Sequence, residues 1–251
     1  MTRVISLPWY DLPSARQGLD AFWSALRDAL HREGVERLPT QLDRTTPVEA
    51  QWSHPDLLLS QCCGLDLFTS ATSAVVPVGR PVFGNLSCKP GDYFSYVVAA
   101  PGAALPPRRI AVNAVSSRSG CTALLAWLDE RGWTPQEVQV SGSHLASADL
   151  VRRGLADIAA IDAHSWGLMR RGGLEVIGES APAPTPPFVS RAGSDVPSAV
   201  LLRALGVAVA KGGDRIGIRE VLPADAQTYR SLEDEAILMQ RVTQRCQSVF
   251  G

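Results

Sequence analysis

Three serines and a glycine at one predicted strand-to-helix turn have the spacing of an anion-binding site. Ser116, Ser117, Ser119 and Gly120 directly precede a helix-like run at residues 121–131. Backbone N–H groups in the first turn of a helix have no helical partner, and the helix dipole adds positive charge there. One serine suffices to cap a helix, so the alternative, a simple cap, leaves the other hydroxyls without a role. The sequence therefore predicts an oxyanion cradle that needs no lysine.

An imidazole and a carboxyl group occupy corresponding positions at the next two predicted turns. His144 ends the segment Ser141-Gly-Ser-His144 between a strand and a helix, where it can donate to an oxygen of a ligand. Asp162 follows the apolar run 158–161, where it can accept a hydrogen from a protonated ligand or an amine. The alternatives are a structural histidine and an aspartate that only caps the helix containing Ser165.

Polar and aromatic side chains elsewhere are candidates for the facing wall of the site. Tyr10 follows the first predicted strand, Gln61 closes the second, and Tyr93 and Tyr96 lie on a strand predicted to cross between lobes. Aromatic side chains with polar tips can pack an organic substituent and hydrogen-bond an oxygen. The alternative is that these are ordinary half-buried strand residues.

The elements that must position these residues follow an α/β pattern. The N-terminal part is predicted to contain strands at residues 3–9, 56–61, 74–82 and 92–100, and a helix at 19–32. Three β-α units follow, with strands at 109–113, 137–140 and 157–161 and helices at 121–131, 146–153 and 165–170. A strand at 174–177 and helices at 196–210 and 232–246 complete the pattern.

Two proline-rich linkers flank the three β-α units, at residues 101–107 and 181–187. Such segments are extended and semi-rigid, so the chain is expected to leave one lobe, build a second, and return. We predict that residues 1–97 plus 186–251 form lobe I and residues 98–185 form lobe II. Each lobe is expected to be a mixed, mainly parallel sheet flanked by helices. A two-strand hinge of this kind leaves an interlobe cleft that can bury a ligand.

Composition excludes several classes of partner. The chain of 251 residues carries 24 basic and 25 acidic side chains, which argues against a nucleic-acid partner. Its five cysteines contain no CxxC pair, so the sequence predicts neither a disulfide framework nor a metal site, and no cofactor is expected. Cys62 and Cys63 are interpreted as small residues at a strand end, with a redox or metal element as the alternative.

The N-terminal residues become polar and aromatic at once, unlike a secretory leader. No run approaches the roughly 18 apolar residues of a membrane-spanning helix. We therefore expect no membrane insertion, and we expect the protein to be a monomer. It would be cytoplasmic with the sequence as written, and periplasmic if the start is truncated or misassigned.

Three motifs resemble the phosphate- and phosphonate-binding family of ABC-transporter solute-binding proteins, and the resemblance extends from about residue 4 to about residue 207. The motifs are Val112-Asn-Ala-Val-Ser-Ser-Arg-Ser-Gly120, Ser141-Gly-Ser-His144 and Gly154-Leu-Ala-Asp-Ile-Ala-Ala-Ile-Asp162. The resemblance implies a two-lobed type II periplasmic-binding-protein fold. It also implies that the oxyanion is held by the hydroxyl-rich turn, by His144 and by a tyrosine on the crossing strand, which is Tyr93 or else Tyr96. Asp162 matches the acidic residue that follows the Ala-Asp-Ile-Ala-Ala strand in this family.

The expected function is capture of a small phosphonate, phosphate or phosphite in the cleft, by a transport receptor or an intracellular sensor. The partner would be an ABC-transporter permease or a sensor protein. The alternative is a cytosolic enzyme on the same scaffold, similar to menaquinone-pathway enzymes, although the sequence has no GxSxG, P-loop or zinc motif. An interaction module with an empty cleft is a third possibility.

Overall fold

The computed structural model describes residues 2–235 and residue 237. The chain divides into two compact units, Met1–Asp92 with Pro184–Arg230, and Tyr93–Ala183 with Ser231–Gly251. The predicted lobe boundaries after residues 97 and 185 lie slightly further along the chain than these limits. Residues 231–235, which we predicted to belong to lobe I, group instead with the second unit, where Glu235 forms an ion pair with Arg118. Most of the predicted helix 232–246 lies outside the described residues.

The first unit contains a five-stranded sheet in the order β1-β2-β11-β3-β12. Its strands are β1 (Val4–Ile5), β2 (Leu57–Gln61), β3 (Val75–Phe83), β11 (Phe188–Arg191) and β12 (Ile218–Pro223). Strands β1 and β2 are parallel, whereas β11 runs antiparallel to β2 and β3, and β12 runs antiparallel to β3. The expectation of a mainly parallel sheet is therefore wrong for this unit. Strand β11 comes back from the second unit, so no β-α crossover sets its direction.

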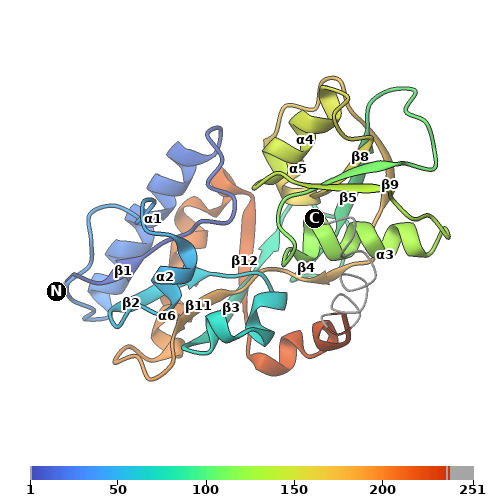
Figure 1. Cartoon of the computed structure of the whole chain (residues 1–251). Helices are drawn as coiled ribbons and strands as arrows, with labels where there is room; N and C mark the ends of the chain where they lie inside the picture. The colour runs from blue at the N-terminus through green and yellow to red at the C-terminus, as the bar shows by residue number, and fades with distance from the viewer. Residues whose placement is uncertain (1, 236, 238–251) are drawn as a thin grey trace. The chain divides into compact units, whose positions relative to one another are not determined.

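Two long helices of the first unit, α1 (Arg16–Arg32) and α6 (Ser198–Gly212), pack against each other (Figure 1). Helix α1 buries one apolar stripe at helical spacing, made of Leu19, Phe22, Trp23, Leu26, Ala29 and Leu30. Shorter helical segments are α2 (Val48–Trp52), η1 (Leu65–Phe68), η2 (Ser70–Thr72), η4 (Gly213–Ile216) and η5 (Ala226–Tyr229). The predicted helix at residues 19–32 corresponds to α1, and the predicted buried strand at residues 56–61 corresponds to β2, so both predictions are confirmed.

The second unit contains a sheet in the order β7-β6-β8-β5-β9. Its strands are β5 (Ser95–Ala99), β6 (Arg109–Val112), β7 (Glu137–Val140), β8 (Ile158–Asp162) and β9 (Glu175–Glu179). Strand β6 runs parallel to β7 and β8, while β5 runs antiparallel to β8 and β9. All three predicted β-α units are therefore present, and the sheet is mixed because β5 and β9 belong to the chain segments that enter and leave the unit.

Helices cover both faces of this second sheet (Figure 1). A one-turn π-helix, η3 (Arg118–Thr122), continues into α3 (Ala123–Asp129) on one face, and α4 (His144–Arg152) and α5 (Ala163–Leu168) lie on the other. Alternate strand residues point to opposite faces. Val97, Val112, Ile158 and Ala160 pack against Leu124, Trp127 and Leu128 of α3, and Val98, Ala111, Ala159 and Ile161 pack against Ala148, Val151 and Trp166.

Two short strands, β4 (Asp92–Tyr93) and β10 (Ala183–Pro184), pair with each other where the chain passes from one unit to the other. On the side of the first unit, Arg80 fixes this crossing. Its Nη1 atom donates to the backbone oxygen of Gly91 (2.9 Å) and to Oδ1 of Asp92 (3.1 Å). Arg80 therefore holds the backbone at the start of β4, where the chain passes to the second unit.

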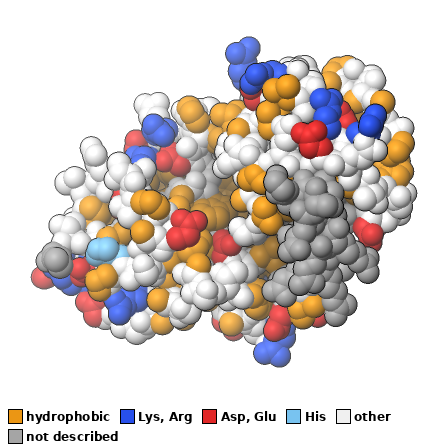
Figure 2. Space-filling model, viewed as in Figure 1, with side chains coloured by type: hydrophobic (Ala, Val, Ile, Leu, Met, Phe, Trp, Pro, Cys, Tyr) orange, Lys and Arg blue, Asp and Glu red, His pale blue; other side chains and the backbone are white. Residues whose placement is uncertain are grey.

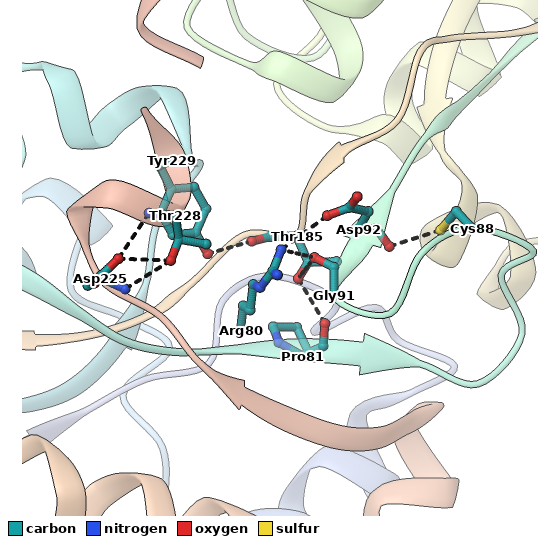
Figure 3. A network of polar contacts seen from close by, with 9 residues as sticks. All are labelled: Arg80, Pro81, Cys88, Gly91, Asp92, Thr185, Asp225, Thr228 and Tyr229. Carbon is teal, nitrogen blue, oxygen red and sulfur yellow. Dashed lines mark hydrogen bonds and ion pairs between the residues drawn. The ribbon is translucent and has the colours of Figure 1, made fainter. Parts of the chain in front are cut away.

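Thr185 extends this polar network to the other two crossing points (Figure 3). Its hydroxyl donates to the backbone oxygen of Pro81 (2.8 Å), and its backbone N–H donates to that of Gly91 (2.9 Å). The hydroxyl of Tyr229, just before the third crossing, donates to the backbone oxygen of Thr185 (2.8 Å). The three crossing segments are thus tied together at one buried residue.

The face in Figure 2 has acidic and basic side chains interspersed among apolar and neutral ones. This distribution agrees with the near-zero net charge of the chain. Within the described residues, none of the helices combines the length and apolar character needed to cross a bilayer.

Replacement of Tyr229 by phenylalanine should destabilise the first unit, because the buried backbone oxygen of Thr185 loses its hydroxyl donor. The expected loss in the free energy of unfolding is about 1–3 kcal/mol, measured by urea denaturation. Tyr96→Phe is the matched control, since no hydrogen bond of that hydroxyl is seen among the described residues. Equal stability of the Tyr229→Phe variant and the native protein would show that the bond contributes nothing.

Candidate anion-binding site

The parallel strands of the second unit bring three turns to one edge of the sheet. In register, Val112 at the end of β6 lies beside Val140 at the end of β7, and Ala111 lies beside Ala159 of β8. The segments that follow these strands therefore begin at the same edge. This is the edge at which open α/β sheets bind ligands.

The first turn is built around Ser117. Its side-chain oxygen accepts the N–H of Gly120 (3.1 Å), and its backbone oxygen accepts the N–H groups of Cys121 (3.0 Å) and Thr122 (3.1 Å). Ser117 is thus the N-cap of the helical stretch and is buried together with Ser119, whereas Ser116 is exposed. The wider π turn that follows is a feature often found at functional sites.

Gly120 is required by the close approach of a neighbouring side chain. A Cβ atom at this position would overlap Oδ1 of Asn113 and would lie 3.2 Å from Cε1 of His144. Oδ1 of Asn113 is buried and has no hydrogen-bond partner among the described residues. The glycine thus lets Asn113 and His144 lie against the backbone of the cradle.

His144 is the first residue of α4, and its ring is held by hydrogen bonds at both nitrogens. Nδ1 lies 3.2 Å from the backbone oxygen of Ala160, which can only accept, so Nδ1 carries a proton. Nε2 lies 2.9 Å from Oγ of Ser119. Burial lowers the pKa of His144 from its ordinary value of 6.5, while the nearby Asp162 and the bond to Ala160 act in the opposite direction.

Asp162, the last residue of β8, has the capping role, and its expected role as a hydrogen-bond acceptor for the ligand stays a prediction. Its Oδ1 accepts the backbone N–H of Ser165 (2.9 Å) and caps α5. Its Oδ2 lies 3.5 Å from Nε2 of His144, and the residue is only 4% exposed. The structure therefore brings Ser117, Ser119, His144 and Asp162 together.

Tyr93 is buried near the same turn. Its ring centre lies 5.8 Å from the guanidinium carbon of Arg118. Arg118 is almost fully buried, and its Nη2 donates to the backbone oxygen of Ala181 (2.8 Å) while its Nε donates to Glu235 (3.2 Å). Tyr96, the second choice, packs on Trp166 at the opposite face of the sheet and does not join this group.

Two serines of the second turn hold the turn together. Ser143 caps α4 by accepting the N–H of Ala146 (3.1 Å). The hydroxyl of Ser141 contacts Ser147 (2.7 Å) and the backbone oxygens of Val112 (3.2 Å) and Ser143 (3.0 Å). Both hydroxyls are therefore engaged within the turn itself.

Tyr10 and Gln61 belong to the first unit, so their predicted role as ligand contacts stays a prediction. Oε1 of Gln61 accepts the backbone N–H of Trp9 (3.2 Å) and thereby fixes the turn after β1. Tyr10 has a φ of 76°, a left-handed conformation that is strained for a tyrosine, and its ring packs edge-on against Phe83.

Ser95 and Thr122 lie at the same edge of the sheet and were not among the residues predicted for the site. Ser95 pairs with Asp162 across the antiparallel β5–β8 ladder, in a non-hydrogen-bonded pair flanked by the bond from Ala163 N to Phe94 O (2.9 Å). Side chains are closest in such pairs. The buried hydroxyls of Ser95 and Thr122 have no hydrogen-bond partner among the described residues. Thr122, three residues after Ser119, could have been found from helical spacing, but Ser95 could not.

A Gly120→Ala substitution should destabilise the second unit by about 1–3 kcal/mol, the usual cost of overpacking, because its Cβ overlaps Asn113. Thermal or urea unfolding measures the loss. The Asn113→Ala, Gly120→Ala double variant should recover part of it by removing the overlapping oxygen. Gly206→Ala is the control, because no atom lies within 4 Å of its added Cβ. A stable Gly120→Ala protein would contradict the observed packing.

The depressed pKa of His144 should make stability fall as the pH drops below about 6.5, since the unfolded chain then binds a proton that the folded protein does not. In His144→Gln this part of the pH dependence should disappear. Asp66, whose pKa burial raises to about 6, acts in the opposite direction, but it is common to both proteins and cancels in the difference. Urea denaturation from about pH 5 to about pH 8 measures it, with His31→Gln as control. Identical slopes for native protein and His144→Gln would count against a buried neutral imidazole.

Comparison with known proteins bears on the family and the fold of this chain. A sequence model of the family described as "ABC transporter, phosphonate, periplasmic substrate-binding protein" matches residues 87–229, more than half of the chain. No curated protein sequence matches the chain significantly.

Solved structures of the same fold cover nearly the whole chain. A binding protein component of an ABC phosphonate transporter from Pseudomonas aeruginosa is 13% identical, with a TM-score of 0.73 over 96% of this chain and 88% of that one. PhnD1 from Prochlorococcus marinus, in complex with methylphosphonate, is 14% identical, with a TM-score of 0.73 over 96% and 98%. A Xanthomonas citri protein bound to ATP is 17% identical, with a TM-score of 0.67 over 97% and 98%. These likenesses confirm the predicted periplasmic-binding-protein fold, and the family match shows that this chain belongs to the periplasmic phosphonate-binding family of ABC-transporter substrate-binding proteins.

Proposed function

We propose that this protein reversibly binds a small phosphonate-type oxyanion at the edge of the second sheet, as the substrate receptor of an ABC transporter. The observation that carries the proposal is the convergence of side chains from three successive β-α turns. Oγ of Ser119 lies 2.9 Å from Nε2 of His144, and that nitrogen lies 3.5 Å from Oδ2 of Asp162. A helix cap alone would not bring these three residues together.

The chemistry of the cradle suits an oxyanion. Ser117 and Ser119 offer hydroxyl donors at the N-terminal end of the helical stretch from Arg118 to Asp129, where the helix dipole adds positive charge. Both serines are buried, so a charge placed there is poorly screened by water and its hydrogen bonds are strong. Nε of Arg118 donates to Glu235 and its Nη2 to the backbone oxygen of Ala181, so both atoms are engaged beside the cradle.

The comparisons support the ligand class. The matched family is described by phosphonate transport, and the Prochlorococcus marinus relative was solved with methylphosphonate. Methylphosphonate is therefore the first ligand to test, ahead of phosphate and phosphite. A permease of the ABC type is the partner that this role requires, and a sensor protein is the alternative partner.

One observation favours a second candidate, an enzyme on the same scaffold. A serine hydroxyl 2.9 Å from an imidazole nitrogen is the arrangement of a nucleophile and its general base. In a hydrolytic triad, however, the carboxylate lies on the other imidazole nitrogen. Here Nδ1 of His144 faces the carbonyl of Ala160, and Asp162 lies near Nε2. The arrangement thus favours binding over hydrolysis.

Isothermal titration of the full chain with methylphosphonate should show saturable binding of one ligand. Ser119→Ala should weaken it by about 10- to 100-fold, the value of one hydrogen bond to a charged group. Ser53→Ala, an exposed serine at the end of α2, is the matched control and should bind normally.

Two outcomes would contradict the proposal. If a folded Ser119→Ala, Ser117→Ala double variant binds methylphosphonate with unchanged affinity, the ligand does not bind at this turn. Conversion of methylphosphonate to a new species, followed by phosphorus NMR over several hours, would make the protein an enzyme.

A further inference from the structure

We propose that Glu235 sets the affinity of the anion site, because it neutralises the buried cation of Arg118 and so keeps oxyanion binding weaker than the serines and the guanidinium together would make it. This inference rests on the proposed function and concerns the regulation of that same site. The observation that carries it is the position of Arg118 in the chain, between the two buried cradle serines, Ser117 and Ser119.

The guanidinium of Arg118 is buried within the second unit. The side chain is only 3% exposed, and its Nη2 atom donates to the backbone oxygen of Ala181 (2.8 Å). The ring centre of Tyr93 lies 5.8 Å from the guanidinium carbon. These contacts hold the group in one place, and an arginine keeps its proton in a protein. A permanent positive charge therefore lies within one side-chain length of the cradle.

Glu235 supplies the counter-charge. A buried cation is costly unless an anion or several hydrogen bonds compensate it. Oε2 of Glu235 lies 3.2 Å from Nε of Arg118, although the two residues are 117 positions apart in the chain. Both belong to the second unit. The side chain of Glu235 is 32% exposed, so the carboxylate stays in contact with water while it pairs with the buried guanidinium.

An oxyanion in the cradle and the carboxylate of Glu235 share one cation. The attraction between the ligand and Arg118 is offset by the repulsion between the ligand and Glu235, so the pair adds little net charge to the site. Charges about 8 Å apart still interact in physiological salt, and they are screened less where protein lies between them. Without the carboxylate, the guanidinium would attract the ligand unopposed. A receptor that passes its ligand on must also release it, and a fixed carboxylate that limits affinity serves that need.

A purely structural role for Glu235 predicts the opposite result. If the carboxylate only held Arg118 and the cradle turn in place, its loss would loosen the turn and weaken binding. If it offsets the charge of Arg118, its loss strengthens binding. The sign of the change in affinity therefore separates the two roles.

The experiment is isothermal titration of the full chain with methylphosphonate at neutral pH. Glu235→Gln keeps an oxygen for Nε of Arg118 and removes only the charge, so it should bind about 3- to 10-fold more tightly than the native protein. Glu233→Gln is the matched control, because it removes the same charge from an exposed position two residues earlier. Its affinity should change by less than about twofold, since water and salt screen an exposed charge.

Two further variants test whether the net charge of the pair decides the affinity. Arg118→Met removes the cation and leaves the carboxylate of Glu235 alone, so it should bind most weakly. The Arg118→Met, Glu235→Gln double variant removes both charges and should bind about 3- to 10-fold more tightly than Arg118→Met. The four proteins should therefore rank by the charge of the pair, with Glu235→Gln first and Arg118→Met last.

Equal or weaker binding by a folded Glu235→Gln variant would overturn the inference while leaving the proposed function intact. If that variant does not fold, Arg118→Met and the double variant decide, because the double variant contains no buried unpaired cation. Equal affinities of those two proteins would then overturn the inference. A native protein that binds none of methylphosphonate, phosphate and phosphite would instead remove the proposed function itself.

Discussion

The parallel pairing of β6 with β7 and β8 is the constraint on which the candidate site depends. Parallel strands in register end together, so the turn containing Ser119, the start of α4 and the end of β8 must lie side by side. The same pairing places the carbonyl of Ala160 within reach of His144. Backbone hydrogen bonds, more than any single side chain, thus position the chemistry of this protein.

The site is held by groups that are themselves anchored. Ser117 is occupied as a cap, Asp162 as another cap, and His144 by a strand carbonyl. Side chains fixed in this way lose little freedom when a ligand arrives, which favours tight and selective binding. The buried oxygens of Ser95, Asn113 and Thr122 have no hydrogen-bond partner among the described residues.

The local features of the site could be predicted from the sequence, because β-α alternation and capping residues act over short distances. Ser117, Ser119, His144 and Asp162 each lie at or next to the junction between a strand and the helix that follows it, and that pattern is visible without a structure. Ser95 could not be predicted, since only the pairing of β5 with the distant β8 sets it opposite Asp162. The directions of β11 and β12, and the ion pair that joins Glu235 to Arg118, are long-range features of the same kind. The charge state of His144 depends on burial, which the sequence does not specify.

The cap that Asp162 forms on α5 links the site to an indole. Trp166 lies on that helix, one residue after the capped Ser165. It is almost fully buried, with Tyr96 at 6.4 Å and the guanidinium of Arg171 at 5.8 Å from its ring. Any redistribution of charge at Asp162 changes the electric field along this short helix and hence the emission of the indole. The protein thus carries an intrinsic fluorophore beside its candidate site, which lets occupancy be followed optically without a chemical label.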